Sequence, residues 1–265
     1  MFNEKPVISK WVADMYDQRV TETDDVEFLL STIGEFSGRA PVRVLEACCG
    51  SGRILVPLAR AGHDATGFDA DEFMLAKIPA KAAGLNNIRW RKADAARDDW
   101  GAGYDVVVLF ANILYNITSD MDYAQSQELF IRKAADVLAP GGRVFIDYRP
   151  ARNLITPDTE SRKMDDCLIW EGADSEGNHG RMALVDYAYD AAAKLDIFTR
   201  RFELTMKNGE TVTQDIPCVK HNASLEQARG WLAAAGLMIE AEYGGYDRRP
   251  IGAETERAII IAKGI

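Results

Sequence analysis

Residues 42–69 read VRVLEACCGSGRILVPLARAGHDATGFD. The apolar run over residues 42–46 is typical of a buried strand, and Gly50-Ser51-Gly52 follows it closely. Apolar residues then recur at helical spacing over residues 53–61, and Gly62 stops that pattern. A second apolar run over residues 65–68 ends at Asp69. The order strand, glycine-rich turn, helix, strand predicts the first unit of an α/β sheet.

The same alternation continues downstream. Residues 88–93, 104–110 and 143–148 read as strands, while residues 71–83 and 123–138 read as helices. The run YDVVVLF at 104–110 is typical of a strand buried on both faces. Two further helices, over residues 8–18 and 25–36, precede the first strand. Five strands separated by helices predict a mostly parallel sheet, whose ligands bind beyond the carboxyl ends of the strands.

The pattern changes after Pro150. Strands are expected at residues 167–172, 182–190, 195–206 and 211–219, and the sequence KNGE at 207–210 is a strong hairpin signal. These residues predict an antiparallel ribbon inserted after strand five. Ser224 and Gln227 then form a capping box that opens a helix ending at Gly236, and residues 237–243 and 257–262 read as two last strands.

Composition excludes some functions. The chain has 265 residues, with 41 Asp and Glu against 31 Lys and Arg, for a net charge of −10. This balance argues against a protein that coats a nucleic-acid backbone. No apolar run approaches the roughly 20 residues that a membrane span needs, and the start of the chain has no signal-peptide pattern. The four cysteines form no C-x-x-C pair, so we expect no zinc or other metal site, reduced thiols and a cytoplasmic location.

The glycine-rich turn is the first chemical signal. A turn of this kind lets backbone N–H groups approach a ligand closely. The nicotinamide pattern G-x-G-x-x-G fails at Leu55, which disfavours an oxidoreductase. Asp69 follows Glu46 by 23 residues, which suits an acid that binds the hydroxyls of a ribose. The alternative for Asp69 is a cap of the helix expected at 71–83.

With these features in place, the chain resembles the class I S-adenosylmethionine-dependent methyltransferases. The string VLEACCGSGR at 44–53 is similar to the first motif of that family, in the variant with Cys48 where the commonest form has Gly. The strings GHDATGFD at 62–69, KADA at 92–95 and LAPGG at 138–142 resemble three further motifs in the same order. The resemblance implies a Rossmann-like, seven-stranded, mostly parallel sheet with an antiparallel last strand, helices on both faces and the inserted ribbon.

The resemblance also implies a division of the chain and a cofactor, S-adenosyl-L-methionine. Residues 1–149 would hold N-terminal lid helices and the cofactor-binding core, 150–221 a substrate-cover insert, and 222–265 the C-terminal helix with the last two strands. Tyr16 is the candidate lid, and its alternative is an ordinary core aromatic. The candidate cofactor-binding residues are Tyr16, Glu46, Ala47, Gly50, Gly52, Arg53, Asp69, Ala70, Asp94, Ala95 and Phe110.

The acceptor side follows from VFIDYR at 144–149, which resembles the matching strand of glycine and sarcosine N-methyltransferases. In those enzymes an Arg at the position of Arg149 binds a substrate carboxylate. A guanidinium can form two parallel hydrogen bonds to a carboxylate, which fits this role. The alternative for Arg149 is an ion pair with an acid of the insert, and that for His221 is a hydrogen-bonded structural histidine. The substrate-binding candidates are Arg149, Tyr115 and Tyr187, and the catalytic candidates are Asn112, Tyr115, Tyr148 and His221.

These observations favour a methyltransferase that acts on a small molecule, with the nitrogen of an amine or amino acid as acceptor. Methyl transfer by in-line displacement depends mostly on the alignment of the acceptor atom with the methyl group. The absence of an obvious catalytic base in the sequence therefore does not count against a methyltransferase. An O- or C-methyltransferase of a natural-product pathway and a non-catalytic cofactor-binding accessory protein are the alternatives. We expect no nucleic-acid or membrane partner, and the insert is where a homodimer contact would form.

Overall fold

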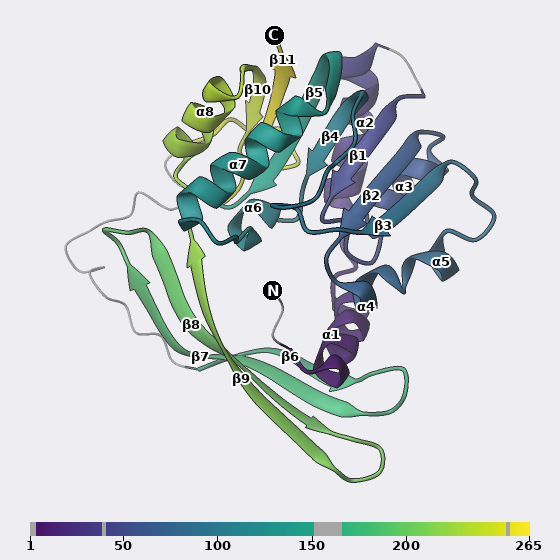
Figure 1. The fold of residues 1–265 in the computed structure, drawn as a ribbon, viewed down its shortest axis with the longest axis vertical. Helices are drawn as coiled ribbons and strands as arrows, with labels where there is room; N and C mark the ends of the chain where they lie inside the picture. Colours follow the sequence, from purple (N-terminus) through teal and green to yellow (C-terminus); the bar gives the residue numbers. More distant parts are fainter. Residues whose placement is uncertain (1–3, 39–40, 151–165, 253–254) are drawn as a thin grey trace. The chain divides into compact units, whose positions relative to one another are not determined.

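The computed structural model describes residues 4–38, 41–150, 166–252 and 255–265. They form two compact units, shown in Figure 1. The first, here called the insert unit, consists of the described residues within 1–21 and 154–222, and the second, the core unit, of those within 22–153 and 223–265. The boundary differs from the predicted division, because helix α1 (Pro6–Arg19) groups with the insert and not with the core.

The core unit contains the predicted seven-stranded sheet, in the order β10-β11-β5-β4-β1-β2-β3. The strands pair in parallel except for β11, which is antiparallel to both of its neighbours. The expected Rossmann-like sheet with an antiparallel last strand is therefore confirmed. Its strands are β1 (Arg43–Ala47), β2 (Asp64–Asp69), β3 (Ile88–Lys92), β4 (Tyr104–Leu109), β5 (Leu138–Tyr148), β10 (Leu237–Tyr243) and β11 (Ala258–Gly264).

The strand order reverses at β1, which pairs with β2 on one side and with β4 on the other. The chain winds toward β3 from one side of this point and toward β5 from the other. In open α/β sheets, ligands bind at such a point, beyond the carboxyl ends of the strands. The site described below is built from the loops that leave β1 and β4 and from the end of β2.

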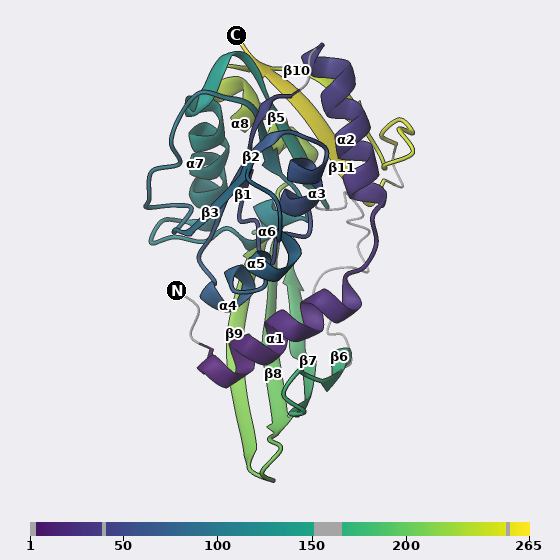
Figure 2. The ribbon, with the colours of Figure 1, turned by 90° about the vertical axis from the view of Figure 1, so that its right-hand side faces the viewer.

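Helices cover both faces of the core sheet, as Figure 2 shows. One hydrophobic cluster joins the sheet to α2 (Asp24–Ser37) and α3 (Leu55–Arg60), and another joins it to α7 (Tyr123–Asp136) and α8 (Leu225–Ala234). Consecutive residues of β1 alternate between them, with Val44 in the first cluster and Leu45 in the second. Such alternation explains why the inner strands read as continuous apolar runs.

Two local expectations differ from the structure. The single helix predicted at 71–83 is two short helices, α4 (Glu72–Leu75) and α5 (Ile78–Lys81). Pro79 lies in the first turn of α5, where its missing N–H costs nothing, whereas inside one continuous helix it would remove a hydrogen bond. The loop after β4 also contains a short helix that was not predicted, α6 (Ile113–Asn116).

The insert unit contains a four-stranded antiparallel sheet whose strands pair in chain order. This confirms the predicted inserted ribbon. Each strand pairs with the next along the chain, and the expected hairpin closes where Gly209 donates from its backbone N–H to the Met206 carbonyl. The strands are β6 (Cys167–Ala173), β7 (His179–Asp190), β8 (Leu195–Thr205) and β9 (Thr211–His221).

Helix α1 packs across this sheet (Figure 2). Trp11 is fully buried, and its indole N–H donates to the Gly172 carbonyl at 3.0 Å. The helix approaches β7 so closely at Gly180 that a Cβ there would lie 2.6 Å from the Trp11 ring. The apolar side chains of α1 and of the sheet form one cluster, listed as Ile8, Trp11, Met15, Met182, Phe202 and Leu204. This cluster explains why α1 belongs to the insert unit.

Candidate functional site

The turn after β1 has the close-approach geometry that its glycines predict. Cys48, Gly50 and Gly52 all have positive φ angles, of 60°, 51° and 78°. At Gly52 a Cβ would lie 3.1 Å from Ile78 and 3.2 Å from Val56, so packing as well as φ favours glycine there. Cys48 adopts the same left-handed region where the commonest form of the motif has Gly, which is unusual for a residue with a side chain. The turn is therefore a fixed backbone surface at the carboxyl end of β1.

Asp69 joins this turn to the end of β2. One carboxylate oxygen accepts the Gly50 N–H at 2.8 Å, and the other accepts the Asp71 N–H at 2.8 Å. The helix-cap alternative belongs to Asp71 instead, whose side chain accepts from the N–H groups of Phe73 and Met74. Burial raises the pKa of Asp69, and the two N–H donors oppose that shift. The carboxylate oxygens keep further lone pairs that could accept from hydroxyl donors.

Glu46 and Arg53 flank the turn in different ways. Glu46 is buried at 5% exposure, and its Oε2 has no hydrogen-bond partner in the part of the chain that the structure describes. Burial raises the pKa of Glu46 well above its usual range. Arg53 forms a two-bond ion pair with the buried Asp25 of α2, and it also donates to the Glu22 carbonyl at 3.1 Å. Its guanidinium thus ties helix α2 to the turn.

Asp94 follows β3 and organises its own loop. Its Oδ1 accepts the Ala96 N–H at 2.8 Å and the Arg97 N–H at 3.3 Å, so the carboxylate caps a tight turn. The Ala95 carbonyl accepts from the Trp100 indole at 2.9 Å, which pins the turn to the core. Among the other cofactor candidates, Ala47 and Phe110 are buried and Ala70 is half-buried.

The loop after β4 is held by a buried acid that the sequence did not single out. Ala111 and Asn112 both have left-handed backbones, with φ of 60° and 56°. The Ala111 N–H donates to Asp147 Oδ2 at 3.2 Å, and the Asn112 N–H donates to the Asp147 carbonyl at 3.2 Å. The Asn112 side chain then accepts the Arg149 N–H at 2.9 Å. Both strained residues are thus fixed by the end of β5.

Asp147 itself is fully buried and forms an ion pair with Arg257, and it accepts from the Tyr246 hydroxyl at 2.9 Å. Burial raises its pKa, while Arg257 and Tyr246 oppose the shift. The sequence does contain a signal for Asp147, which is an acid at the end of an apolar strand. A carboxylate that is buried there needs hydrogen-bonding or charged partners.

The acceptor-side candidates of the core unit occupy different environments. Arg149 is exposed, and Tyr115 is half-buried in α6. Tyr148 is 1% exposed and its ring packs in the hydrophobic cluster beneath α7 and α8. Burial raises the pKa of Tyr148, and its hydroxyl has no partner among the described residues. Neighbouring positions of a strand point to opposite faces, which explains why Tyr148 and Asp147 differ.

Three candidates lie in the insert unit. Tyr16 is half-buried in α1, and His221 is buried at the end of β9. The Tyr187 hydroxyl donates to Asp196, and its ring stacks on Phe198 with centroids 6.2 Å apart. Burial raises the pKa of Tyr187, and Asp196 adds to the shift.

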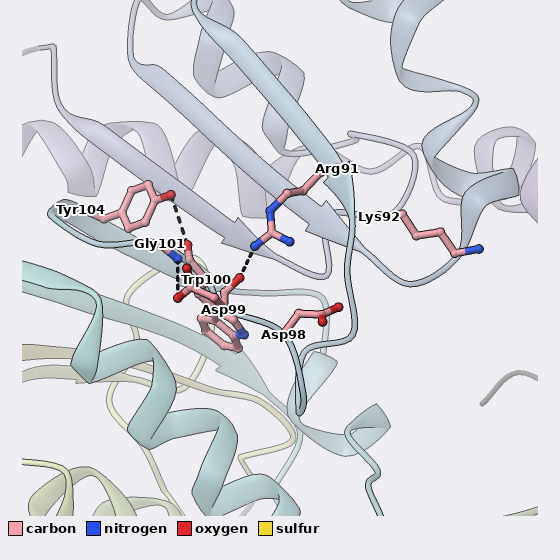
Figure 3. Close-up of a pocket in the computed structure, with 7 residues that line it drawn as sticks. All are labelled: Arg91, Lys92, Asp98, Asp99, Trp100, Gly101 and Tyr104. Carbon is pink, nitrogen blue, oxygen red and sulfur yellow. Dashed lines mark hydrogen bonds between the residues drawn. The ribbon is translucent and has the colours of Figure 1, made fainter.

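A surface pocket lies beside β3 and the start of β4, as Figure 3 shows. None of the predicted site residues lines it. Polar groups of its lining form hydrogen bonds with one another. Arg91 donates to the Asp99 carbonyl, and the Tyr104 hydroxyl donates to the Trp100 carbonyl. We therefore take the carboxyl ends of β1, β2 and β4, and not this pocket, as the candidate functional site. The lining residues are Arg91, Lys92, Asp98, Asp99, Trp100, Gly101 and Tyr104.

Comparisons with known proteins indicate the class of domain that the core unit contains. Residues 44–142 match the family described as "Methyltransferase domain". The chain is 31% identical over 108 residues to the ubiquinone biosynthesis O-methyltransferase of Chelativorans sp. strain BNC1, covering 40% of this chain and 39% of that protein. It is 27% identical over 124 residues to rat glycine N-methyltransferase, covering 40% of each. The match thus spans about two fifths of the length of these curated relatives.

The likeness in fold extends further. The solved structure of the CcbJ methyltransferase from Streptomyces caelestis superposes with a TM-score of 0.71 at 20% identity, over 97% of both chains. The matched segment, residues 44–142, includes the glycine-rich turn, Asp69, Asp94 and the loop after β4. Residues 44–142 therefore resemble a methyltransferase domain, and the fold of the chain is similar to that of a solved methyltransferase structure.

Proposed function

We propose that the protein transfers a methyl group from S-adenosyl-L-methionine to a small-molecule acceptor. The observation that carries this proposal is the bond between the Gly50 N–H and Asp69, which joins the glycine-rich turn to the acid after β2 at the reversal of strand order. This arrangement supports the proposal because backbone donors and a carboxylate with remaining acceptor capacity lie together at the carboxyl ends of the strands.

The residues present fit the cofactor. Asp69 has acceptor capacity for ribose hydroxyls, and the buried Oε2 of Glu46 is an acceptor that has no partner among the described residues. Asp94 and Ala95 would hold the adenine, and Gly50 and Gly52 would leave space for the methionyl part. When bound, the cofactor supplies an electrophilic methyl group on a sulfonium. The protein would align the acceptor with it and exclude water, and alignment alone can contribute about 7–11 kcal/mol.

We infer that the acceptor atom is the nitrogen of an amine or amino acid. An amine needs only to lose its proton and be oriented, and the hydroxyl of Tyr115 and the amide of Asn112 are suited to orient it. Oxygen acceptors such as phenols usually need a base or a metal. The relatives include both an O- and an N-methyltransferase, so O- or C-methylation stays the alternative.

A screen of amines, amino acids and phenols for release of S-adenosylhomocysteine tests this proposal. We expect release with amines or amino acids and a product that carries the new methyl on nitrogen. A product methylated on oxygen or carbon would contradict the nitrogen assignment. Cofactor binding without turnover of any acceptor would overturn the enzymatic proposal and favour an accessory protein.

Arg149 offers a sharper test of the acceptor class. Its backbone is fixed by Asn112, and in the described part of the chain its guanidinium has no ion pair. Arg149→Ala should raise KM for acidic acceptors at least tenfold, or about 1.4 kcal/mol, and change KM for neutral acceptors much less. Arg89→Ala is a matched control, because Arg89 is exposed and pairs with Asp64 at the opposite end of β2. Equal effects of Arg149→Ala on both acceptor classes would remove Arg149 from acceptor binding.

Two expectations from the sequence stay predictions: a cytoplasmic location and a homodimer formed through the insert. Within the described residues, each helix is too short or too polar to cross a bilayer.

A further inference from the structure

Helix α5 holds the glycine-rich turn from a side that Asp69 does not reach. The ammonium of Lys81 donates to the Ser51 carbonyl at 2.9 Å and to the Ser51 hydroxyl at 3.0 Å. Ser51 is fully buried and Lys81 is half-buried, so these bonds are shielded from much of the solvent. A hydrogen bond from a charged donor is stronger than one from a neutral donor. The turn therefore has a charged partner on α5 as well as the carboxylate of Asp69.

The packing of α5 agrees with this contact. Ile78 and Lys81 are three residues apart and lie on the same side of the helix. Ile78 packs against Gly52, where a Cβ would lie 3.1 Å from its side chain. The Lys81 carbonyl accepts from the Arg60 side chain, at the end of α3, at 2.9 Å. The backbone of Lys81 is thus tied to the end of α3, while its side chain reaches the turn that precedes α3.

The bond to the Ser51 carbonyl fixes the orientation of one peptide group. A peptide group is planar and trans, so the carbonyl of Ser51 and the N–H of Gly52 point in opposite directions. Lys81 holds the carbonyl, and the N–H donates to the Cys49 carbonyl at 2.9 Å. Gly52 has a φ of 78°, and glycine tolerates φ of either sign. Without these bonds the peptide group could therefore turn over at little cost.

We propose that Lys81 is a positioning residue that holds the glycine-rich turn in the conformation that binds S-adenosyl-L-methionine. This inference rests on the proposed function, because it concerns the cofactor named there. Asp69 holds the Gly50 N–H, and Lys81 holds the peptide group between Ser51 and Gly52, so each fixes a different part of the turn. A turn that is already ordered loses less conformational entropy when a ligand binds, which raises the affinity.

Calorimetric titration with S-adenosyl-L-methionine tests this role in the intact protein and in Lys81→Met. The substitution keeps a side chain of similar length and removes the donor, so we expect Kd to rise about tenfold. Lys81→Arg keeps a charged donor and should recover most of the affinity. Arg60→Met is the matched control, because it removes the bond to the backbone of Lys81 and leaves the bonds to Ser51 in place. Its Kd should change less than about twofold.

Amide hydrogen exchange gives a readout that needs no cofactor. In Lys81→Met the Gly52 N–H should exchange faster than in the intact protein, because its peptide group is no longer held at the Ser51 carbonyl. The N–H groups within β1 should exchange at unchanged rates, which excludes a loss of overall stability as the cause. Should Lys81→Met not fold, Lys81→Gln takes its place.

The outcomes separate this role from packing and from the proposed function. If Lys81→Met and Arg60→Met weaken cofactor binding equally, or neither weakens it, Lys81 serves only to pack α5 and the proposal is overturned. An unchanged exchange rate of the Gly52 N–H in Lys81→Met would overturn it as well. If the intact protein does not bind the cofactor, the proposed function fails and the cofactor role of Lys81 fails with it. The exchange rates then still show whether Lys81 fixes the turn.

Discussion

Replacing Asp69 with alanine should weaken the binding of S-adenosyl-L-methionine at least tenfold, or about 1.4 kcal/mol. The substitution removes the carboxylate that would bind the ribose, and it also releases the Gly50 N–H at 2.8 Å. The glycine-rich turn would lose its anchor to β2 as well as an acceptor for the ligand. Calorimetric titration of both proteins with the cofactor measures the difference.

The same strand supplies a control for this result. Asp64 lies at the other end of β2, where it is partly exposed and pairs with Arg89. Asp64→Ala should leave cofactor affinity unchanged and alter stability little, since exposed ion pairs contribute about 0–1 kcal/mol. A similar loss of affinity in both variants would mean that the effect is general destabilisation and not the loss of a ligand contact.

Replacing Asp147 with alanine should lower the free energy of unfolding by about 3–5 kcal/mol, because it leaves the Arg257 charge partly buried without its partner. It also removes the acceptors of the Tyr246 hydroxyl and of the Ala111 N–H. Urea unfolding measures the loss. Glu203→Ala is the control, because it breaks the exposed pair with Arg181 and should cost only about 1 kcal/mol or less.

A milder variant separates stability from function at Asp147. Asp147→Asn keeps the size of the side chain but weakens its hold on the left-handed residues Ala111 and Asn112. We expect kcat to fall more than cofactor affinity, because the loop after β4 would lose its fixed geometry while the turn after β1 stays intact. Unchanged kcat in a folded Asp147→Asn variant would show that the buried pair serves stability alone.

Features governed by short-range chemistry could be predicted from the sequence. The capping box is present as expected, with the Ser224 side chain accepting from the Gln227 N–H and the Gln227 side chain accepting from the Ser224 N–H. The KNGE turn closes as expected, and the glycine-rich turn has the positive φ angles that its residues favour. In each case a few neighbouring residues determine the conformation, so no distant contact can change the outcome.

Features that depend on distant partners could not be predicted. Asp25 and Arg53 are 28 residues apart, and Asp147 and Arg257 are 110 apart, so no local pattern announces either pair. The residues of α1 read as a helix whichever sheet the helix covers. Helix α1 packs on the sheet of the insert unit because Trp11 fits closely against Gly180 of β7. These two residues belong to segments that are far apart in the chain.

The split of the predicted helix at 71–83 has a different cause. The prediction of one helix used the stop signal at Gly84 and took no account of Pro79. A proline is tolerated in the first turn of a helix and not in its interior, so the chain begins a second helix at Ile78. Proline position was thus a better guide here than periodicity.

Calorimetric titration of the intact protein with S-adenosyl-L-methionine tests the central claim most directly. The site at the ends of β1, β2 and β4 predicts saturable binding of one cofactor per chain, competed by S-adenosylhomocysteine. No binding at millimolar cofactor would contradict the account, because the glycine-rich turn and Asp69 would then serve only to close the end of the sheet.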